Sequence, residues 1–232
     1  MIDVHTHVLH CVDDGSPDVD TSVEMLTEEV RQGVTDVICT PHARREYAFS
    51  RREKEKRFLE LKERVKREKL PINIYLGHEN LVDKKFLARL SKGEVGTLGD
   101  SKYVLLEFDY YKEIDISDVV YEVGRHGYKA IVAHYERYVY AGIEEAYDIK
   151  EMGGLIQVNA DAIVGERKRA YKKKIMSLFK EGLVDFVASD VHHSRENQMK
   201  KAKAYVEKKV GPEAAYTVFI KNAKKILEDI KG

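Results

Sequence analysis

The sequence predicts an α/β fold in which parallel strands alternate with helices and close into a barrel. Seven apolar runs of strand length are separated by segments with helical periodicity. Such alternation favours parallel strands joined by right-handed crossovers. The units show no obvious reversal of order, which favours a barrel over an open sheet. A chain of 232 residues can bury the core of such a fold as one domain, residues 1–232.

The expected strands are short, apolar and rich in β-branched residues, and turn-forming or polar residues bound them. In chain order, they span residues 2–5, 36–40, 72–76, 103–106, 129–133, 155–158 and 184–188.

The expected helices have apolar residues three or four positions apart on one face. For the first helix, Ser16 is a candidate N-cap, Pro17 a candidate first helical residue and Gly33 a candidate C-cap. Further helices are expected near residues 51–69, 84–90, 117–126, 142–152, 171–178, 195–210 and 212–230.

The composition excludes several classes of function. Lys+Arg and Asp+Glu are equal at 40 each, so no overall field attracts nucleic acid or an anionic membrane. The longest apolar runs are far too short to span a bilayer, and the N-terminus lacks the pattern of a signal peptide. Cys11 and Cys39 offer no disulfide framework and suit a reducing compartment. We therefore expect a cytoplasmic protein without membrane insertion.

Residues suited to metal binding lie at or just beyond the carboxyl ends of the expected strands. In a parallel barrel these ends converge on one face, where such enzymes place their sites. His5 and His7 are two residues apart, so on a strand their imidazoles would project from the same face. Asp14 lies in the loop that follows. The complete candidate set is His5, His7, Asp14, His42, Glu79, Glu107, His134, Asp190 and His192.

Nine candidate ligands are too many for a single ion, so two or three metal ions are expected, with Glu79 as a plausible bridge. Imidazole and carboxylate without thiolate suit Mn²⁺, Fe²⁺ or Zn²⁺. Closely spaced metals can generate a hydroxide nucleophile and bind the oxygens of an in-line phosphoryl displacement. The expected chemistry is phosphoester hydrolysis.

Several motifs carry a resemblance to a known family. Four stretches of the sequence resemble the motifs of the PHP (polymerase and histidinol phosphatase) superfamily. They are His5-Thr-His7 with Asp13-Asp14-Gly15, Thr40-Pro41-His42, Gly77-His-Glu79 and Ser189-Asp190-Val-His192. A narrower resemblance, to the CpsB/CapC/YwqE group, lies in Leu98-Gly-Asp100-Ser101, Leu106-Glu107-Phe108, Ala133-His134-Tyr-Glu136-Arg137-Tyr138 and Gln157-Val-Asn159-Ala160. The match runs in order from Ile2 to about Leu227.

The CpsB/CapC/YwqE group comprises bacterial manganese-dependent protein-tyrosine phosphatases linked to capsule and exopolysaccharide synthesis. The resemblance implies a distorted seven-stranded (β/α)7 TIM-like barrel with a trinuclear site, and assigns the nine candidate residues as ligands. It also implies that Arg137 and Arg195 contact the phosphate. Mn²⁺ would be the most plausible cofactor. The partner would be a phosphotyrosine protein, plausibly a bacterial tyrosine kinase of polysaccharide synthesis.

The sequence departs from the family pattern at three places. Tyr135 stands where the family usually has proline, Ala223 follows Asn222 where proline is usual, and His193 follows the last candidate ligand. We expect Tyr135 to line the mouth of the site, where it would affect which phosphoester fits. His10 is expected close enough to the site to donate a proton.

A second motif has to be weighed against the metal site. Cys39 and Arg45 have the Cys-x5-Arg spacing of thiol-based tyrosine phosphatases. That chemistry requires a thiolate of lowered pKa in a loop of backbone N–H groups. Here Pro41 removes one N–H and Cys39 lies in an apolar strand, so we interpret Cys39 as a small core residue.

Our hypothesis is a metal-dependent phosphotyrosine phosphatase in which a metal-bound hydroxide attacks phosphorus while Arg137 and Arg195 bind the phosphoryl oxygens. One alternative is a small-molecule phosphomonoesterase, such as a histidinol-phosphate phosphatase. Another is a metal-stabilised binding module without turnover. A nuclease is less favoured because the chain has no net charge and no basic stripe.

Overall fold

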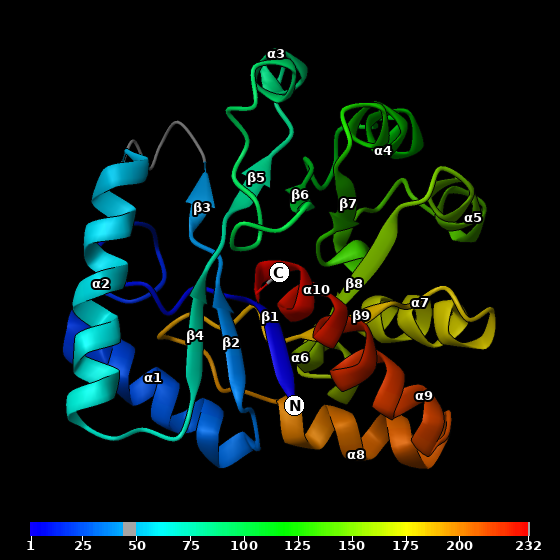
Figure 1. The fold of residues 1–232 in the computed structure, drawn as a ribbon. Helices are drawn as coiled ribbons and strands as arrows, with labels where there is room; N and C mark the ends of the chain where they lie inside the picture. Colours follow the sequence, from blue (N-terminus) through cyan, green and yellow to red (C-terminus); the bar gives the residue numbers. More distant parts are fainter. Residues whose placement is uncertain (44–49, 232) are drawn as a thin grey trace.

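Parallel strands lie at the centre of the molecule and helices surround them (Figure 1). The structure, a computed structural model, describes residues 1–43 and 50–231. Every strand pairing within the sheets is parallel, and the strands are β1 (Ile2–Thr6), β2 (Asp36–Cys39), β3 (His42–Ala43), β4 (Asn73–Leu76), β5 (Glu79–Leu81), β6 (Tyr103–Glu107), β7 (Lys129–Val132), β8 (Leu155–Asn159) and β9 (Phe186–Ala188).

The helices follow the strands in alternation. They are α1 (Val19–Gln32), α2 (Arg51–Arg67), α3 (Phe86–Ser91), α4 (Ile116–Arg125), the 3₁₀ turn η1 (Tyr135–Arg137), α5 (Ile143–Glu151), α6 (Ala160–Val164), α7 (Arg169–Lys180), α8 (Met199–Lys209), α9 (Pro212–Tyr216), the π-helical turn η2 (Thr217–Lys221) and α10 (Asn222–Lys231). None of the described helices is long and apolar enough to cross a membrane.

The predicted parallel α/β architecture is confirmed, but the strands form two sheets rather than one continuous ring. Their orders are β1-β2-β4 and β3-β5-β6-β7-β8-β9. The two sheets also meet at β1 and β9, where Thr6 bridges to Val191 and the Asp190 N–H donates to the His5 carbonyl at 2.8 Å. The result is a strongly curled arrangement of parallel strands with helices outside it.

Pairing is interrupted after β2 and after β4 and resumes in the short strands β3 and β5, which lie beyond the ends of the expected strands and were not predicted. Pro41 has no N–H to donate, so the ladder of β2 stops before it. Gly77 comes close to the neighbouring strand, because a Cβ there would lie 2.8 Å from Ile38 Cγ2. Pairing resumes with His42 directly opposite Glu79. The interruptions therefore place two candidate ligands side by side.

Three helix predictions also differ from the structure. Helix α1 is capped by Asp18 and not by Ser16, because the Asp18 carboxylate accepts the Thr21 N–H at 2.8 Å. Pro17 consequently lies before the helix and not inside it. Helix α8 begins at Met199 and not at residue 195, and α6 was not predicted.

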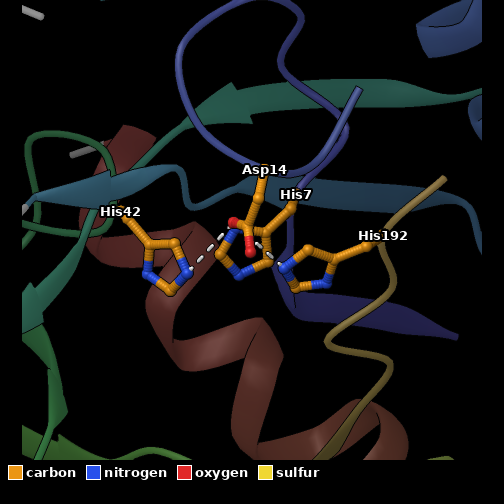
Figure 2. A group of neighbouring side chains, drawn as sticks. All are labelled: His7, Asp14, His42 and His192. Atoms are coloured by element: carbon orange, nitrogen blue, oxygen red, sulfur yellow. Dashed lines mark ion pairs between the residues drawn. The ribbon is translucent and has the colours of Figure 1, made fainter. Parts of the chain in front are cut away.

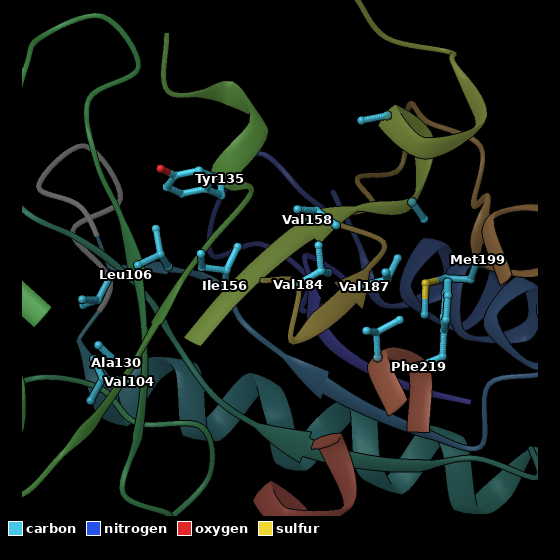
Figure 3. Packing of buried hydrophobic residues seen from close by; sticks show 14 of the residues in the cluster. Val104, Leu106, Ala130, Tyr135, Ile156, Val158, Val184, Val187, Met199 and Phe219 are labelled. Carbon is cyan, nitrogen blue, oxygen red and sulfur yellow. The ribbon is translucent and has the colours of Figure 1, made fainter. Parts of the chain in front are cut away.

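Apolar side chains pack on both faces of the strands, as alternation along a strand requires. Val104, Leu106 and Ala130 belong to the larger core cluster (Figure 3), which also contains Val120 and Val123 of helix α4. On the opposite face, a second cluster contains Val4 and Leu105 together with residues of α10, which lies over the middle of the strands in Figure 1. The residues that α10 contributes are Ala223, Ile226 and Leu227.

A pair of acidic side chains is buried beneath the first strand. Asp3 accepts the Ser189 N–H at 3.1 Å, and Glu29 of α1 accepts the Asn197 side-chain amide at 2.6 Å. Burial and the neighbouring Asp3 carboxyl raise the pKa of Glu29 well above its usual value. The protonated form of Glu29 is therefore the one that suits the folded protein.

Replacing Glu29 should alter how stability depends on pH. The pKa of Glu29 is raised on folding. Its contribution to the free energy of unfolding is therefore complete below the unfolded pKa of 4.5 and is lost as pH rises through the pKa of the folded state. Glu29→Gln cannot ionise, so its free energy of unfolding relative to wild type should increase as pH rises. Urea denaturation between pH 4 and 9 measures this, with exposed Glu24→Gln on the same helix as the control. Parallel pH profiles for Glu29→Gln and wild type would contradict the assignment.

Candidate metal centre

The structure brings all nine predicted metal-binding residues together at the carboxyl ends of the strands. They form four overlapping groups in which the potential ligand atoms lie within 4.8 Å of one another. Eight of the nine residues are buried, and only Asp14 is exposed. The groups are His7, Asp14, His42 and His192; His5, His7 and Asp190; His5, Glu79 and His134; and His42, Glu79 and Glu107.

Glu79 is at the centre of this arrangement because it contacts four histidines. Its Oε1 lies 2.9 Å from His134 Nε2 and 3.5 Å from His5 Nε2. Its Oε2 lies 2.6 Å from His42 Nδ1 and 3.5 Å from His7 Nε2. Burial by itself would raise the pKa of Glu79, but the nearby imidazoles, with His42 the largest contributor, hold it well below its usual range. An ionised, bridging carboxylate is consistent with this geometry.

A second part of the cluster faces the solvent. The rings of His7 and His192 are stacked with centroids 4.1 Å apart. Asp14 Oδ1 lies 3.5 Å from the Nε2 atoms of both His42 and His192, as Figure 2 shows. The side chain of Asp14 is 54% exposed, so this donor closes the cluster on its outer side.

The hydrogen bonds of His5 and His7 point their Nε2 lone pairs toward the centre of the cluster. His7 Nδ1 donates to Asp13 Oδ2 at 2.8 Å, and His5 Nδ1 donates to Gln157 Oε1 at 3.1 Å. Because each Nδ1 then carries the proton, the two Nε2 atoms, 3.3 Å apart, are both lone-pair donors. Two such donors beside carboxylates and without thiolates fit a divalent cation.

The two predicted phosphate-binding arginines adjoin this cluster. Arg137 Nη2 lies 3.0 Å from Asp190 Oδ2, and its Nη1 donates to the Tyr110 hydroxyl at 3.1 Å. Burial would lower the pKa of Arg137, but the Asp190 carboxylate outweighs it and raises the pKa above its usual value. Arg195 Nη1 donates to the Asp190 carbonyl at 3.2 Å. Both guanidinium groups therefore adjoin Asp190.

Both arginines and five of the nine metal-binding candidates line one cavity of about 380 Å³. Its lining combines charged, aromatic and imidazole side chains from several separate segments of the chain. The lining residues are Asp14, His42, Tyr110, Tyr111, His134, Arg137, Arg167, Lys168, Tyr171, Asp190, His192 and Arg195. Anionic groups of the size of a phosphate can therefore approach the donor cluster and both arginines from solvent.

Comparison with known proteins agrees with this geometry. Residues 1–228 match the family model described as capsular polysaccharide synthesis, CpsB/CapC. The chain is 31% identical over 240 residues to the tyrosine-protein phosphatase CpsB of Streptococcus pneumoniae, covering 99% of both proteins.

The chain belongs to the CpsB/CapC family.

Solved structures support the family fold. Crystal structures of YwqE from Bacillus subtilis and CpsB from S. pneumoniae, described as metal-dependent tyrosine phosphatases, superpose with a TM-score of 0.90 at 28% identity, covering 99% of this chain and 95% of the other. A histidinol phosphate phosphatase from Lactococcus lactis has a TM-score of 0.57 at 15% identity, covering 89% of this chain and 92% of the other. The second likeness concerns the fold alone.

Two further expectations, for Tyr135 and His10, differ from the geometry of this family member, and the structure also shows the contact that His193 makes. Tyr135 is fully buried, donates its hydroxyl to the Gly142 carbonyl at 2.6 Å and does not line the cavity. His10 does not face the cluster, since its Nε2 lies 3.2 Å from Glu60 on α2. His193 Nδ1 donates to the Gly15 carbonyl and so contacts the loop that carries Asp14.

The geometry around Cys39 is that of a core residue. Its side chain is fully buried in β2, and burial raises the pKa of the thiol far above its usual value. A reactive thiolate requires the opposite shift. Arg45, the other end of the Cys-x5-Arg spacing, lies outside the described residues.

Sequence reasoning did not assign roles to several residues that orient the cluster. Asp13 receives hydrogen bonds from His7, from the Gly15 N–H and from the His42 N–H. Gln157 Oε1 also accepts the His134 N–H at 2.8 Å, and the Asn159 amide donates to Asp190 Oδ2 at 2.8 Å. Gln157 and Asn159 lie at the end of an expected strand, on the same edge as the candidate ligands. Their position in the sequence could therefore have indicated that they orient the cluster.

A half-buried lysine supports the turn that carries two site residues. His134 adopts the left-handed backbone conformation with φ 33°, and the 3₁₀ turn η1 with Arg137 follows at once. Lys174 of α7 donates to the carbonyls of Tyr135 and Tyr138 at 2.9 and 2.8 Å. Its ammonium also lies 4.3 Å from the centroid of the Tyr135 ring. These contacts fix the turn from behind the cavity.

Gly15 should be required for metal binding, because no side chain fits there. A Cβ on Gly15 would lie 2.6 Å from His7 Cβ and would also collide with the His7 carbonyl. Gly15→Ala should therefore displace the loop of Asp13 and Asp14 and weaken Mn²⁺ affinity about 10- to 100-fold. Calorimetric titration of purified protein measures this affinity.

Gly124→Ala is the matched control, since nothing lies within 4 Å of a Cβ built at that helical position. It should keep wild-type affinity and gain slight stability. Wild-type Mn²⁺ affinity in Gly15→Ala would show that the loop does not bind the metal.

Proposed function

We propose that this chain is a metal-dependent protein-tyrosine phosphatase of the CpsB/CapC family that contributes to the regulation of capsular or exopolysaccharide synthesis. One observation carries the proposal most directly. Asp190 belongs to the donor cluster, and the guanidinium groups of Arg137 and Arg195 both adjoin it. Cations suited to phosphate oxygens and donors suited to divalent metals therefore share one cavity.

The nine clustered residues would hold two or three divalent ions, with Mn²⁺ as the native metal and Fe²⁺ or Zn²⁺ as alternatives. Ions bound there supply Lewis acidity toward the phosphoester and lower the pKa of bound water. Asp13 and Gln157 fix the tautomers of His7 and His5, so their lone pairs stay directed into the cluster.

The arginines would bind the phosphoryl oxygens and stabilise charge as it develops. Arg137 is the more firmly placed of the two, since Tyr110 and Asp190 both contact its guanidinium. The leaving phenol has a pKa near 10 and departs more easily than an alkoxide, so a strong general acid is not required. This agrees with the position of His10 away from the cavity.

Further features of the proposal concern the whole chain. We propose that the curled strands correspond to a distorted seven-stranded barrel, a reading supported by the contacts between β1 and β9. Residues 1–232 would act as a single domain in the cytoplasm. The substrate would be a phosphotyrosine protein, in particular a bacterial tyrosine kinase of polysaccharide synthesis.

Hydrolysis of a phosphotyrosine peptide should depend on metal and not on Cys39. Activity should disappear on chelation, return with Mn²⁺ and be unchanged in Cys39→Ser, because the thiol is buried away from the donor cluster. Release of inorganic phosphate is the measurement. Activity that survives chelation but is lost in Cys39→Ser would refute the metal mechanism. A higher kcat/KM for histidinol phosphate than for the peptide would favour the small-molecule phosphatase.

Arg137→Lys should lower kcat/KM about 10²- to 10³-fold, because an ammonium cannot reproduce the two directed contacts of the guanidinium. Arg195→Lys should have a smaller effect, since this side chain is more exposed and less firmly bound. Steady-state kinetics at saturating Mn²⁺ measures both, with the exposed Arg125→Lys as the control. Metal content must be equal in all variants, and a wild-type rate in Arg137→Lys would exclude the proposed role.

A further inference from the structure

Three tyrosines line the catalytic cavity, and they differ in whether a ring face is available to a substrate. The ring of Tyr110 has the Arg137 guanidinium 5.5 Å from its centroid, and the ring of Tyr171 has the Lys168 ammonium at 5.6 Å. The third is Tyr111. In the described part of the chain, no hydrogen bond, ion pair or ring contact involves the Tyr111 side chain. Its ring is therefore the one left uncovered.

Tyr111 is also unusually exposed for a large side chain. Its 72% exposure is higher than that of the other exposed large hydrophobic residues in the described chain. An exposed aromatic ring beside a polar catalytic cavity offers apolar area and a π-face that water does not satisfy well. A ligand with an aromatic ring would make use of both.

The loop that carries Tyr111 is fixed by hydrogen bonds. Asp109 Oδ1 accepts the N–H groups of Tyr111 and Lys112, each at 2.9 Å. The Tyr140 hydroxyl donates to the Asp109 carbonyl at 3.1 Å, and the Val139 N–H donates to the Tyr110 carbonyl at 3.2 Å. The exposed ring is thus presented by a well-bonded backbone, and its place relative to Arg137 is set by Tyr110, the adjacent residue.

We propose that Tyr111 determines specificity for aryl phosphates by stacking on the phenyl ring of phosphotyrosine while the arginines bind its phosphate. The inference rests on the proposed phosphatase function and deepens it. With the phosphoryl group at Arg137 and Arg195, the ester group must extend toward the open side of the cavity, where Tyr111 lies. Aromatic stacking there would favour phosphotyrosine over phosphoserine, whose ester group has no ring.

The test compares Tyr111→Ala and Tyr111→Phe with wild type, all loaded with Mn²⁺. Tyr111→Ala should raise KM for a phosphotyrosine peptide about 2- to 10-fold with little change in kcat, as expected for the loss of one aromatic pair. Inhibition by inorganic phosphate, which has no ring, should be unchanged. Tyr111→Phe should retain wild-type KM because the ring remains. Tyr216→Ala, which removes an exposed tyrosine outside the cavity, should match wild type.

Each other outcome identifies a separate failure. An unchanged KM in Tyr111→Ala would overturn the assignment of Tyr111 and leave the phosphatase function intact. A parallel loss of peptide and phosphate binding, or of bound Mn²⁺, would also overturn it by showing that Tyr111 supports the site structurally. Absence of phosphotyrosine hydrolysis by the wild-type protein would overturn the proposed function and this inference with it.

Discussion

The burial of Glu79 among imidazoles is the constraint on which the rest of the structure depends. A carboxylate removed from water is strongly destabilising unless it is paired and hydrogen-bonded. Glu79 has no exposed surface, and histidines from three separate segments of the chain surround it. His5 and His7 lie in and just after β1, His42 lies in β3 and His134 follows β7, so the carboxylate is compensated only when strands distant in sequence adopt their native positions together. The burial of this one carboxylate therefore depends on the curled arrangement of strands from both sheets.

Much of the fold could be predicted because each strand carries its own signal. Apolar runs of four or five residues ended in His, Asp or Glu, and parallel topology then required those ends to meet. All nine candidate ligands consequently lie where the pattern placed them, and the two arginines that the family resemblance implied adjoin Asp190. The short strands β3 and β5 were less visible, because they have only two and three residues and follow Pro41 and Gly77, beyond the apolar runs. Helix α6 has only five residues, too few for periodicity to show.

The parts that sequence reasoning missed depend on contacts between distant segments. Lys174 reads as one of three consecutive surface lysines, and only the fold shows that its ammonium binds the carbonyls behind His134. Tyr135 was expected at the mouth because it adjoins a ligand, yet the left-handed backbone at His134 turns it into the core. His10 similarly lies near the ligands in sequence but pairs with α2. Where the backbone turns sharply, the direction of a side chain cannot be predicted from its neighbours in the sequence.

The second core cluster, which contains residues of α10, has a consequence for folding during synthesis on the ribosome. It contains Ile2 and Val4 from the start of the chain and Leu227 from its end. The first strand also pairs with Val191 through Thr6, and its Asp3 carboxylate accepts the Ser189 N–H. A nascent chain that has emerged only as far as α7 therefore cannot complete the environment of His5. Native contacts of such long sequence separation form slowly, so the environment of His5 would be completed late in folding.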